Sequence, residues 1–169
     1  GQRFAINLAP STVCRVQFPL EVSRLLAKYA IEPWQLIFEV TECSTFCNAE
    51  QALHILRQLQ KMGVRIAIDD FGTGYASYAR LKSVDADILK IDGSFIRNIV
   101  SNSLDYQIVA SICHLARMKK MLVVAEYVET EEIHSAVHAL GIDYVQGYLI
   151  GRPAPLESLL EAEASTADA

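Results

Sequence analysis

Polar side chains suited to metal-dependent chemistry follow six short apolar segments of the sequence. In chain order they are Asn7, Glu39, Asp69 with Asp70, Lys90, Glu126 and Gln146. Carboxylate and amide oxygens are the ligands that hard cations such as Mg²⁺ and Mn²⁺ prefer, and no His or Cys stands at these positions. The residue types therefore indicate a site for divalent metal ions.

The adjacent carboxylates Asp69 and Asp70 are the strongest part of this pattern. They repel each other unless a cation lies between them. Neighbouring residues of a strand point in different directions, so we expect the pair to serve two metal ions, as in enzymes that cleave phosphodiesters.

Lys90 is the one cationic side chain in this set. We expect it to act as a point charge beside the attacking water or the phosphate. The alternative is a Schiff-base lysine, which needs desolvation or cationic neighbours to lower its pKa. A ring of carboxylates has the opposite effect on that pKa, so the sequence favours the first role.

Alternating short strands and longer helices must position these side chains. Apolar runs rich in β-branched residues predict strands of a buried parallel sheet at 4–6, 36–38, 65–68, 88–91, 121–125 and 144–145. Amphipathic stretches predict helices at 20–29, 50–62, 103–118 and 130–140, and a glycine, Gly63 or Gly141, follows two of them. Each polar side chain then lies at the carboxyl end of a strand, and we expect all of them to share one mouth.

Six βα units without a linker predict a single α/β domain. A closed (β/α) barrel of the TIM type has eight strands in about 250 residues. Six units in 169 residues fit an incomplete TIM-like barrel that lacks its first strands. The alternative is an open, doubly wound sheet. We expect the domain to span residues 1–160 and residues 161–169 to form a C-terminal tail.

Composition excludes several classes of function for this segment. The net charge of −5 and the absence of a Lys or Arg cluster argue against sequence-independent binding of long nucleic acid. No signal peptide and no apolar run of about 18 residues is present, which argues against membrane contact by this segment, although the parent protein has room for an anchor elsewhere. The four cysteines lack zinc spacing and indicate reduced thiols, hence a cytoplasmic location.

Several motifs of the chain resemble those of the EAL-domain cyclic-di-GMP phosphodiesterases. They are Asn7-Leu8, Phe38-Glu39-Val40-Thr41-Glu42, Asp69-Asp70-Phe71-Gly72-Thr73-Gly74, Leu89-Lys90-Ile91-Asp92, Ala125-Glu126 with Glu129, and Gln146-Gly147-Tyr148. They stand in the family's order from residue 7 to about 153. The resemblance implies a metal-dependent enzyme, with Mg²⁺ or Mn²⁺, that hydrolyses cyclic di-GMP to linear pGpG.

The resemblance also implies roles for individual residues. The implied metal ligands are Asn7, Glu39, Asp69, Asp70 and Glu126, with Asp69 bridging, and the implied catalytic residues are Lys90, Glu126 and Asp70. Lys90 would orient the attacking water. Glu42 would stabilise the loop after Asp70, Gln146 would touch guanine or the water network, and Glu129 would support them. The family also suggests a homodimer and an upstream diguanylate-cyclase-like or sensor domain.

Two departures from the family pattern bear on activity. The glutamate of the name-giving Glu-Ala-Leu motif and the arginine after it are not in the 169-residue sequence, so we expect this chain alone to be poorly active. Tyr127 stands where the family usually has glycine, so its ring is expected to constrain Glu126 or crowd the mouth. The alternative function is a degenerate EAL domain that acts as a non-hydrolytic cyclic-di-GMP sensor or a protein-interaction module.

Overall fold

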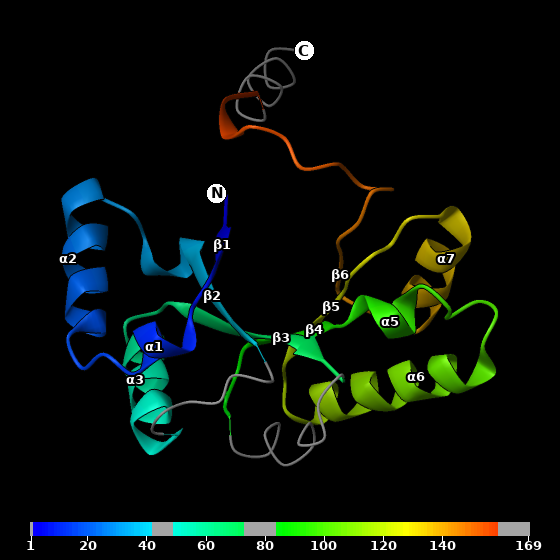
Figure 1. Ribbon diagram of the computed structural model, residues 1–169, viewed down its shortest axis with the longest axis horizontal. Helices are drawn as coiled ribbons and strands as arrows, with labels where there is room; N and C mark the ends of the chain where they lie inside the picture. Colours follow the sequence, from blue (N-terminus) through cyan, green and yellow to red (C-terminus); the bar gives the residue numbers. More distant parts are fainter. Residues whose placement is uncertain (1, 42–48, 73–83, 159–169) are drawn as a thin grey trace.

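The computed structural model describes residues 2–41, 49–72 and 84–158 of the chain. Within these ranges six strands form one parallel sheet (Figure 1): β1 (Phe4–Asn7), β2 (Leu36–Thr41), β3 (Arg65–Phe71), β4 (Ile88–Ile91), β5 (Leu122–Ala125) and β6 (Tyr144–Val145). Their order in the sheet is their order in the chain. A doubly wound sheet reverses its strand order at one point, whereas a barrel does not. The incomplete TIM-like barrel is therefore confirmed.

Helices connect the strands and cover the sheet. They are α1 (Pro10–Val13), α2 (Phe18–Tyr29), η1 (Pro33–Gln35), α3 (Ala49–Lys61), α5 (Gly93–Ile96), α6 (Ser103–Met118) and α7 (Glu131–Ala139). The four longer helices lie where the apolar periodicity predicts them, within two residues at each end. The three short ones were not predicted, because a single turn is too brief to show a periodic pattern.

Two strands run past the polar residues that marked their expected ends. Glu39 lies inside β2, and Asp69 and Asp70 lie inside β3. Backbone pairing continues beside them, with Thr41 opposite Asp69 in the register of β2 and β3. The expectation that every polar side chain ends its strand is therefore wrong for these residues. An apolar run stops at the first polar side chain, but a strand ends only where its backbone partners end.

The register gives the sheet two different faces. Residues on the outer face are apolar and buried under the helices: Phe38, Val40, Ile66, Ile68, Leu89, Ile91, Val123 and Ala125. Successive residues of a strand point to opposite faces. The residues between them, among them Glu39, Asp69 and Lys90, therefore face inward. Alternation and register thus place the chemically active side chains on one concave surface.

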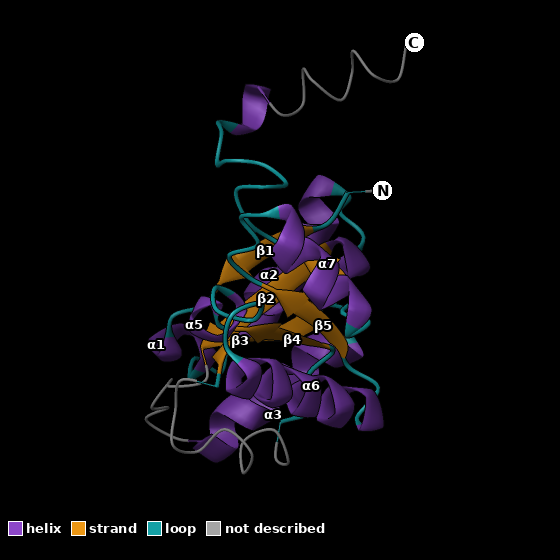
Figure 2. Cartoon of the chain, turned by 90° about the vertical axis from the view of Figure 1, so that its right-hand side faces the viewer, coloured by secondary structure: helices purple, strands orange, loops and turns teal. Residues whose placement is uncertain are grey.

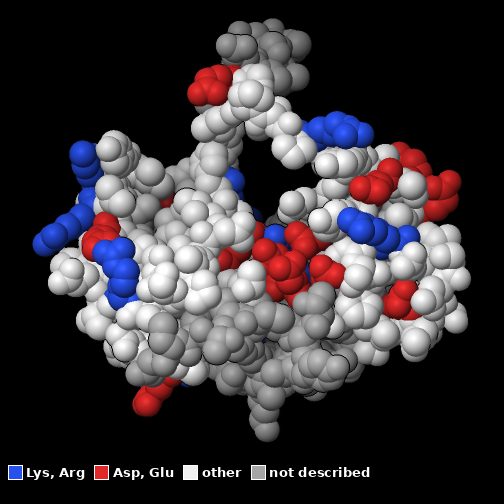
Figure 3. All heavy atoms as spheres, viewed as in Figure 1, with Lys and Arg blue, Asp and Glu red and all other residues white. Residues whose placement is uncertain are grey.

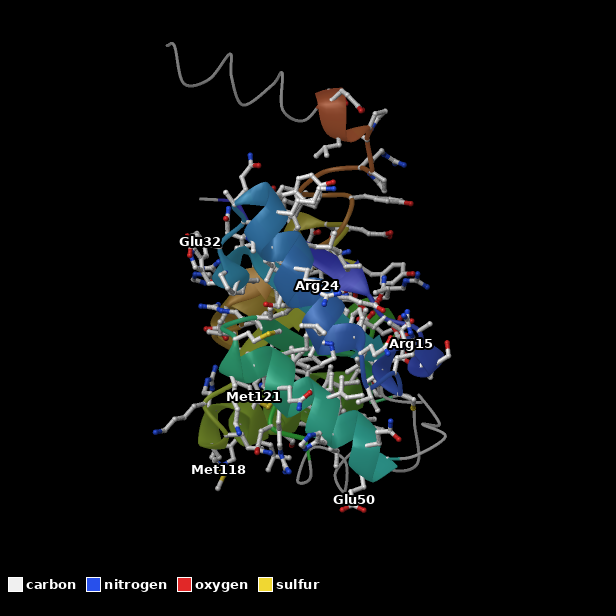
Figure 4. The ribbon with its side chains drawn as sticks, turned by 90° about the vertical axis from the view of Figure 1, so that its left-hand side faces the viewer. Arg15, Arg24, Glu32, Glu50, Met118 and Met121 are labelled. Atoms are coloured by element: carbon white, nitrogen blue, oxygen red, sulfur yellow. The ribbon has the colours of Figure 1, made fainter. Side chains whose placement is uncertain are left out.

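Helices bury the outer face as two apolar clusters. One cluster joins β2 and the start of β3 to α2 and α3, which pack side by side (Figure 4), and the other joins β4 and β5 to α6 and α7. Figure 2 shows α3 and α6 on the same side of the sheet. Charged groups on these helices face solvent, as Glu50 does at the first turn of α3 (Figure 4). Among the described helices, none is both long and apolar enough to cross a membrane.

Two aspartates, placed just before β4 and β6, each bind the strand next to the one that they precede. Asp87 precedes β4, and its Oδ2 accepts a hydrogen bond of 2.8 Å from the backbone N–H of Ile66 in β3. Asp143 precedes β6, and its Oδ2 accepts one of 2.8 Å from Val123 in β5. Both N–H groups belong to buried residues, which need a partner there. The carboxylates therefore hold each strand in register with the one that follows it.

We predict that Asp143→Ala lowers the free energy of unfolding by about 1–3 kcal/mol, because the buried N–H of Val123 loses its acceptor. Asp143→Asn keeps an acceptor oxygen and is expected to lose less. Urea denaturation followed by circular dichroism measures both. The matched control is Asp85→Ala, whose side chain is exposed and pairs with Lys119 only at 3.7 Å, and which should change stability by less than about 1 kcal/mol. Equal losses for Asp143→Ala and the control would contradict this role.

Candidate metal and phosphodiester site

Lys90 lies at the centre of a buried ionic cluster. Its Nζ is 2.8 Å from Asp69 Oδ1, 3.0 Å from Glu126 Oε1 and 3.1 Å from Glu39 Oε2. The four residues come from β2, β3, β4 and the position directly after β5. Only 7% of the Lys90 side chain is exposed, so this ammonium has exchanged water for carboxylates. The cluster therefore ties four neighbouring strands together on the concave face.

The protonation of Lys90 follows from these contacts. Burial alone lowers its pKa, but hydrogen bonds to Asp69 and Glu126 and their negative charges outweigh that effect and hold the pKa well above the usual lysine value. The ammonium is therefore charged throughout the physiological range. This argues further against a Schiff-base role, which requires a neutral amine.

A β-bulge brings the two adjacent aspartates to the same face. Ile68 pairs with Leu89 and Phe71 with Ile91, so Asp69 and Asp70 together oppose a single residue of β4, Lys90. Asp70 adopts the left-handed conformation, with φ of 55°, which absorbs the extra residue. Without the bulge Asp70 would point to the outer, apolar face. The two carboxylates were expected to diverge, whereas an oxygen of each lies within 4.8 Å of the other.

These carboxylates carry more negative charge than Lys90 balances. Burial raises the pKa of Asp70, and the charges of Asp69 and Asp92 raise it further. Burial also raises the pKa of Glu126, although Lys90 opposes the shift. Burial is the first cause of both shifts, and the negative charge of the neighbouring carboxylates adds to it.

The donor set fits a divalent cation. Asp69, Asp70 and Glu126 each offer an oxygen within 4.8 Å of the others. Asp69 Oδ1 is buried and, apart from its ion pair with Lys90, accepts no hydrogen bond from the described residues. Glu39 reaches the same ammonium, and Asn7 lies beside Glu39 in the register of β1 and β2. The structure thus gathers the predicted metal ligands, while their roles as ligands stay a prediction.

A pocket of about 220 Å³ opens beside Glu126. Its walls are Glu126, Tyr127, Glu129, Gln146, Gly147 and Tyr148. Gln146 and Glu129, both predicted to act on the substrate side, therefore share one pocket with a residue of the ionic cluster. Figure 3 shows acidic groups gathered at the centre of this face, beside a hollow. Glu42, predicted to stabilise the loop after Asp70, lies outside the described residues, as do Thr73, Gly74 and the tail at 161–169.

Two residues near the site were not predicted to have a role. Asp92 follows Lys90 by two positions, accepts a hydrogen bond of 2.9 Å from Ser94 N at the start of α5, and contributes to the raised pKa of Asp70. Tyr148 lines the pocket, and Arg152 lies 4.3 Å above its ring. Their places, one residue after β4 and three residues after β6, were the available signal, since this edge of the sheet carries the site.

Comparison with known proteins shows which family of sequences the chain is similar to. The sequence model described as EAL domain matches residues 1–153. The chain is 74% identical over 164 residues to cyclic di-GMP phosphodiesterase PdeF of Escherichia coli strain K12, which covers 96% of this chain and 22% of PdeF. The Pseudomonas aeruginosa protein named bifunctional diguanylate cyclase/cyclic di-GMP phosphodiesterase MucR is 42% identical over 160 residues, 95% of this chain and 23% of MucR. The chain thus spans less than a quarter of the length of either relative.

Solved structures show the same arrangement of strands and helices. The PaMucR phosphodiesterase in complex with c-di-GMP superposes with a TM-score of 0.84 at 42% identity, over 93% of this chain and 64% of that one. BlrP1 of Klebsiella pneumoniae, solved with manganese and the cyclic dinucleotide, gives a TM-score of 0.84 at 33% identity, over 90% of this chain and 39% of that one.

We predict that Asp70→Asn stabilises the metal-free protein at pH 7 by up to about 1 kcal/mol. A carboxyl whose pKa is higher in the folded than in the unfolded state favours folding only when protonated, so its charge opposes folding above its ordinary pKa of 3.8. Asn also tolerates the left-handed backbone at this position. The gain should disappear below about pH 4, where Asp70 is protonated anyway.

Thermal denaturation with and without Mn²⁺ tests this expectation. The same variant should gain less stability from Mn²⁺ than the wild type, because one predicted ligand is neutral. The exposed acid Glu157 supplies the control, since Glu157→Gln should change neither measurement. An Asp70→Asn protein that is less stable than wild type without metal would show that the negative charge is not in excess.

We predict that Lys90→Met lowers the stability of the metal-free protein by about 3–5 kcal/mol, because three buried carboxylates then face one another without an ammonium. Adding Mn²⁺ should restore part of this loss, since a cation takes the place of the missing charge. Urea titrations with and without Mn²⁺ measure both effects. Arg57→Met, on the exposed side of α3, is the control and should stay within about 0.5 kcal/mol. Wild-type stability of Lys90→Met would refute the central role of this ammonium.

Proposed function

The chain belongs to the EAL domain family, and on that premise we propose that the protein is a phosphodiesterase that hydrolyses cyclic di-GMP to linear pGpG in bacterial signalling. The observation that supports this best is the buried cluster in which Glu39, Asp69 and Glu126 surround Lys90, with an oxygen of Asp70 within 4.8 Å of those of Asp69 and Glu126. A substrate with two phosphodiesters is anionic, and an acidic site binds it only with the help of cations. The excess of carboxylates over ammonium groups supplies the place for them.

We propose that Mg²⁺ or Mn²⁺, as two ions, is held by Asn7, Glu39, Asp69, Asp70 and Glu126. All five side chains offer oxygen, which suits these hard cations. Divalent ions held there would activate the attacking water and would offset the charge that develops on the phosphate. Asp69 would be a central ligand, because it lies near Asp70 and, its ion pair with Lys90 apart, its Oδ1 accepts no hydrogen bond from the described residues. Asp70 and Glu126 must lose their protons to serve as ligands, so their raised pKa values favour neutral or alkaline conditions.

Lys90 would have two tasks in this reaction. An ammonium has three N–H donors, and three carboxylates lie within 3.1 Å of this one. Its first task is therefore to hold Glu39, Asp69 and Glu126 in place. Its second task, to orient the attacking water, requires one N–H to turn from a carboxylate toward that water.

The pocket beside Glu126 suits the substrate's bases and sugar-phosphate edge. Tyr148 offers an exposed ring, on which a planar base can stack, and Gln146 and Glu129 offer hydrogen-bonding oxygens. Guanine carries neighbouring N–H donors that match a carboxylate or amide acceptor. Gln146 and Glu129 are thus proposed to contact the substrate side, with Glu42 as a further supporting residue.

We also propose which domain accompanies this one in the intact protein and where the protein is located. The name of MucR joins a diguanylate cyclase to the phosphodiesterase, which supports an upstream domain of that kind or a sensor in the intact protein. Cys14 and Cys113 are reduced, which supports the cytoplasm. A homodimer stays a prediction from the family resemblance.

The intact domain should convert cyclic di-GMP to pGpG with Mg²⁺ or Mn²⁺ and lose that activity with a chelator. Asp69→Ala and Glu39→Ala should each lower turnover at least about a hundredfold, because a predicted ligand is removed. Chromatography of the nucleotide products measures the rate. Glu131→Gln, an exposed residue of α7 outside the cluster, is the control and should retain wild-type turnover. Tight binding of cyclic di-GMP without any product would instead identify a non-hydrolytic sensor.

A further inference from the structure

Tyr127, directly after Glu126, has an unusual backbone for an aromatic residue. Its φ is 55°, in the left-handed region that glycine enters freely and bulky residues avoid. The chain needs this conformation here because the residues before and after Tyr127 face different parts of the structure. Glu126 faces the concave surface and reaches Lys90 at 3.0 Å, whereas Val128 is completely buried in the apolar cluster. A residue other than glycine at this position must be held in place by other contacts.

Gly93 and Arg97 supply those contacts. A Cβ added to Gly93, which is buried at the start of α5, would lie 2.1 Å from Cδ2 of Tyr127, so the ring occupies space that only glycine leaves open. The guanidinium of Arg97 lies 4.0 Å from the ring centroid, within the range of a cation–π contact. The phenol ring thus contacts both the backbone of α5 and a cation.

These contacts connect the two segments that directly follow Lys90 and Glu126 in the chain. Gly93 follows Lys90 by three residues, and Tyr127 follows Glu126 by one. The backbone N–H of Glu126 donates to Ile91 O at 3.4 Å, a long hydrogen bond that holds the glutamate only loosely. On the far side Val128 is fixed by its N–H, which donates to Gln146 O at 3.0 Å. The position of Glu126 relative to Lys90 therefore depends on what holds Tyr127.

We propose that Tyr127 is a positioning residue: its ring, seated on Gly93 and covered by Arg97, fixes the Glu126 carboxylate against Lys90 and so sets the geometry of the metal site. Gly93 and Tyr127 act as a pair, in which the missing side chain of one makes room for the ring of the other. The effect on turnover rests on the proposed function, whereas the effect on metal binding does not.

The test measures the Mn²⁺ affinity of the metal-free, intact domain by electron paramagnetic resonance, well below its melting temperature. Tyr127→Gly removes the ring and accepts the positive φ, so the fold should remain, while the affinity should fall by roughly tenfold. Tyr127→Phe keeps the ring and should bind Mn²⁺ within about twofold of wild type. Tyr29→Ala is the control, because Tyr29 also lies under a cation, Lys28 at 5.0 Å, but in α2, far from the cluster in sequence. That variant should bind Mn²⁺ as the wild type does.

The pairing is tested with Gly93→Ala. Alone, this change should weaken Mn²⁺ binding, because the added Cβ expels the ring. Combined with Tyr127→Gly it should weaken binding no further than Tyr127→Gly alone, since no ring is left to expel. Two results overturn the proposal: wild-type Mn²⁺ affinity in Tyr127→Gly, or a Gly93→Ala effect of equal size with and without the ring. If Gly93→Ala alone does not fold, the Mn²⁺ affinities of Tyr127→Gly and of the double variant still test the proposal, because both should be equally weak.

Turnover of cyclic di-GMP separates this inference from the proposed function. Under the proposal Tyr127→Gly lowers kcat more than it raises KM, because the displaced Glu126 carboxylate is a predicted metal ligand, whereas the side chains proposed to contact the base, those of Gln146, Glu129 and Tyr148, are unchanged. A wild-type domain that binds Mn²⁺ as expected but yields no pGpG refutes the proposed function and leaves the positioning role intact. A Tyr127→Gly domain that hydrolyses cyclic di-GMP as well as the wild type does refutes the positioning role alone.

Discussion

The ion pairs of Lys90 are the interaction on which the rest of the site depends. One ammonium reaches carboxylates from both neighbouring strands and from the strand beyond β3, at 2.8–3.1 Å. Such a buried group is costly to desolvate and is retained only when its partners satisfy it. The carboxylate partners satisfy the Lys90 ammonium here, but together they carry more negative charge than one ammonium balances. The ion pairs hold the site together, and the excess of negative charge leaves it able to attract cations.

Two irregularities of the backbone make this cluster possible. The bulge at Asp69 and Asp70 turns what would be an outward-facing carboxylate toward the concave surface. The left-handed residue Tyr127 turns the chain so that Glu126 faces inward while Val128 is buried. Both departures from regular geometry cost free energy, and both occur beside the ionic cluster. Strain of this kind is found where function requires it and where the surrounding fold holds it in place.

The helices and the apolar outer face provide the rigidity that these irregularities need. Strands β2 to β5 are buried against α3, α6 or their neighbours through side chains such as Ile66 and Leu89, which are completely shielded from solvent. The Asp87 and Asp143 carboxylates fix the register at the opposite edge of the sheet. The inner face is therefore free to carry polar and charged groups, because it contributes little to the apolar core. In barrel enzymes, likewise, the catalytic side chains lie at the carboxyl ends of the strands, and the helices pack around the outside.

By itself the sequence determined the order of strands and longer helices, the α/β class and which residue types gather at one mouth. Those follow from local periodicity and from the rule that parallel strands end at one edge. Only the tertiary structure decided that Glu39 and Asp69 lie within their strands, that a bulge opposes two aspartates to Lys90, and that Gly93 makes room for Tyr127. Each of these depends on partners 20 or more residues away in the chain, and hydrophobic periodicity carries no information about such pairings.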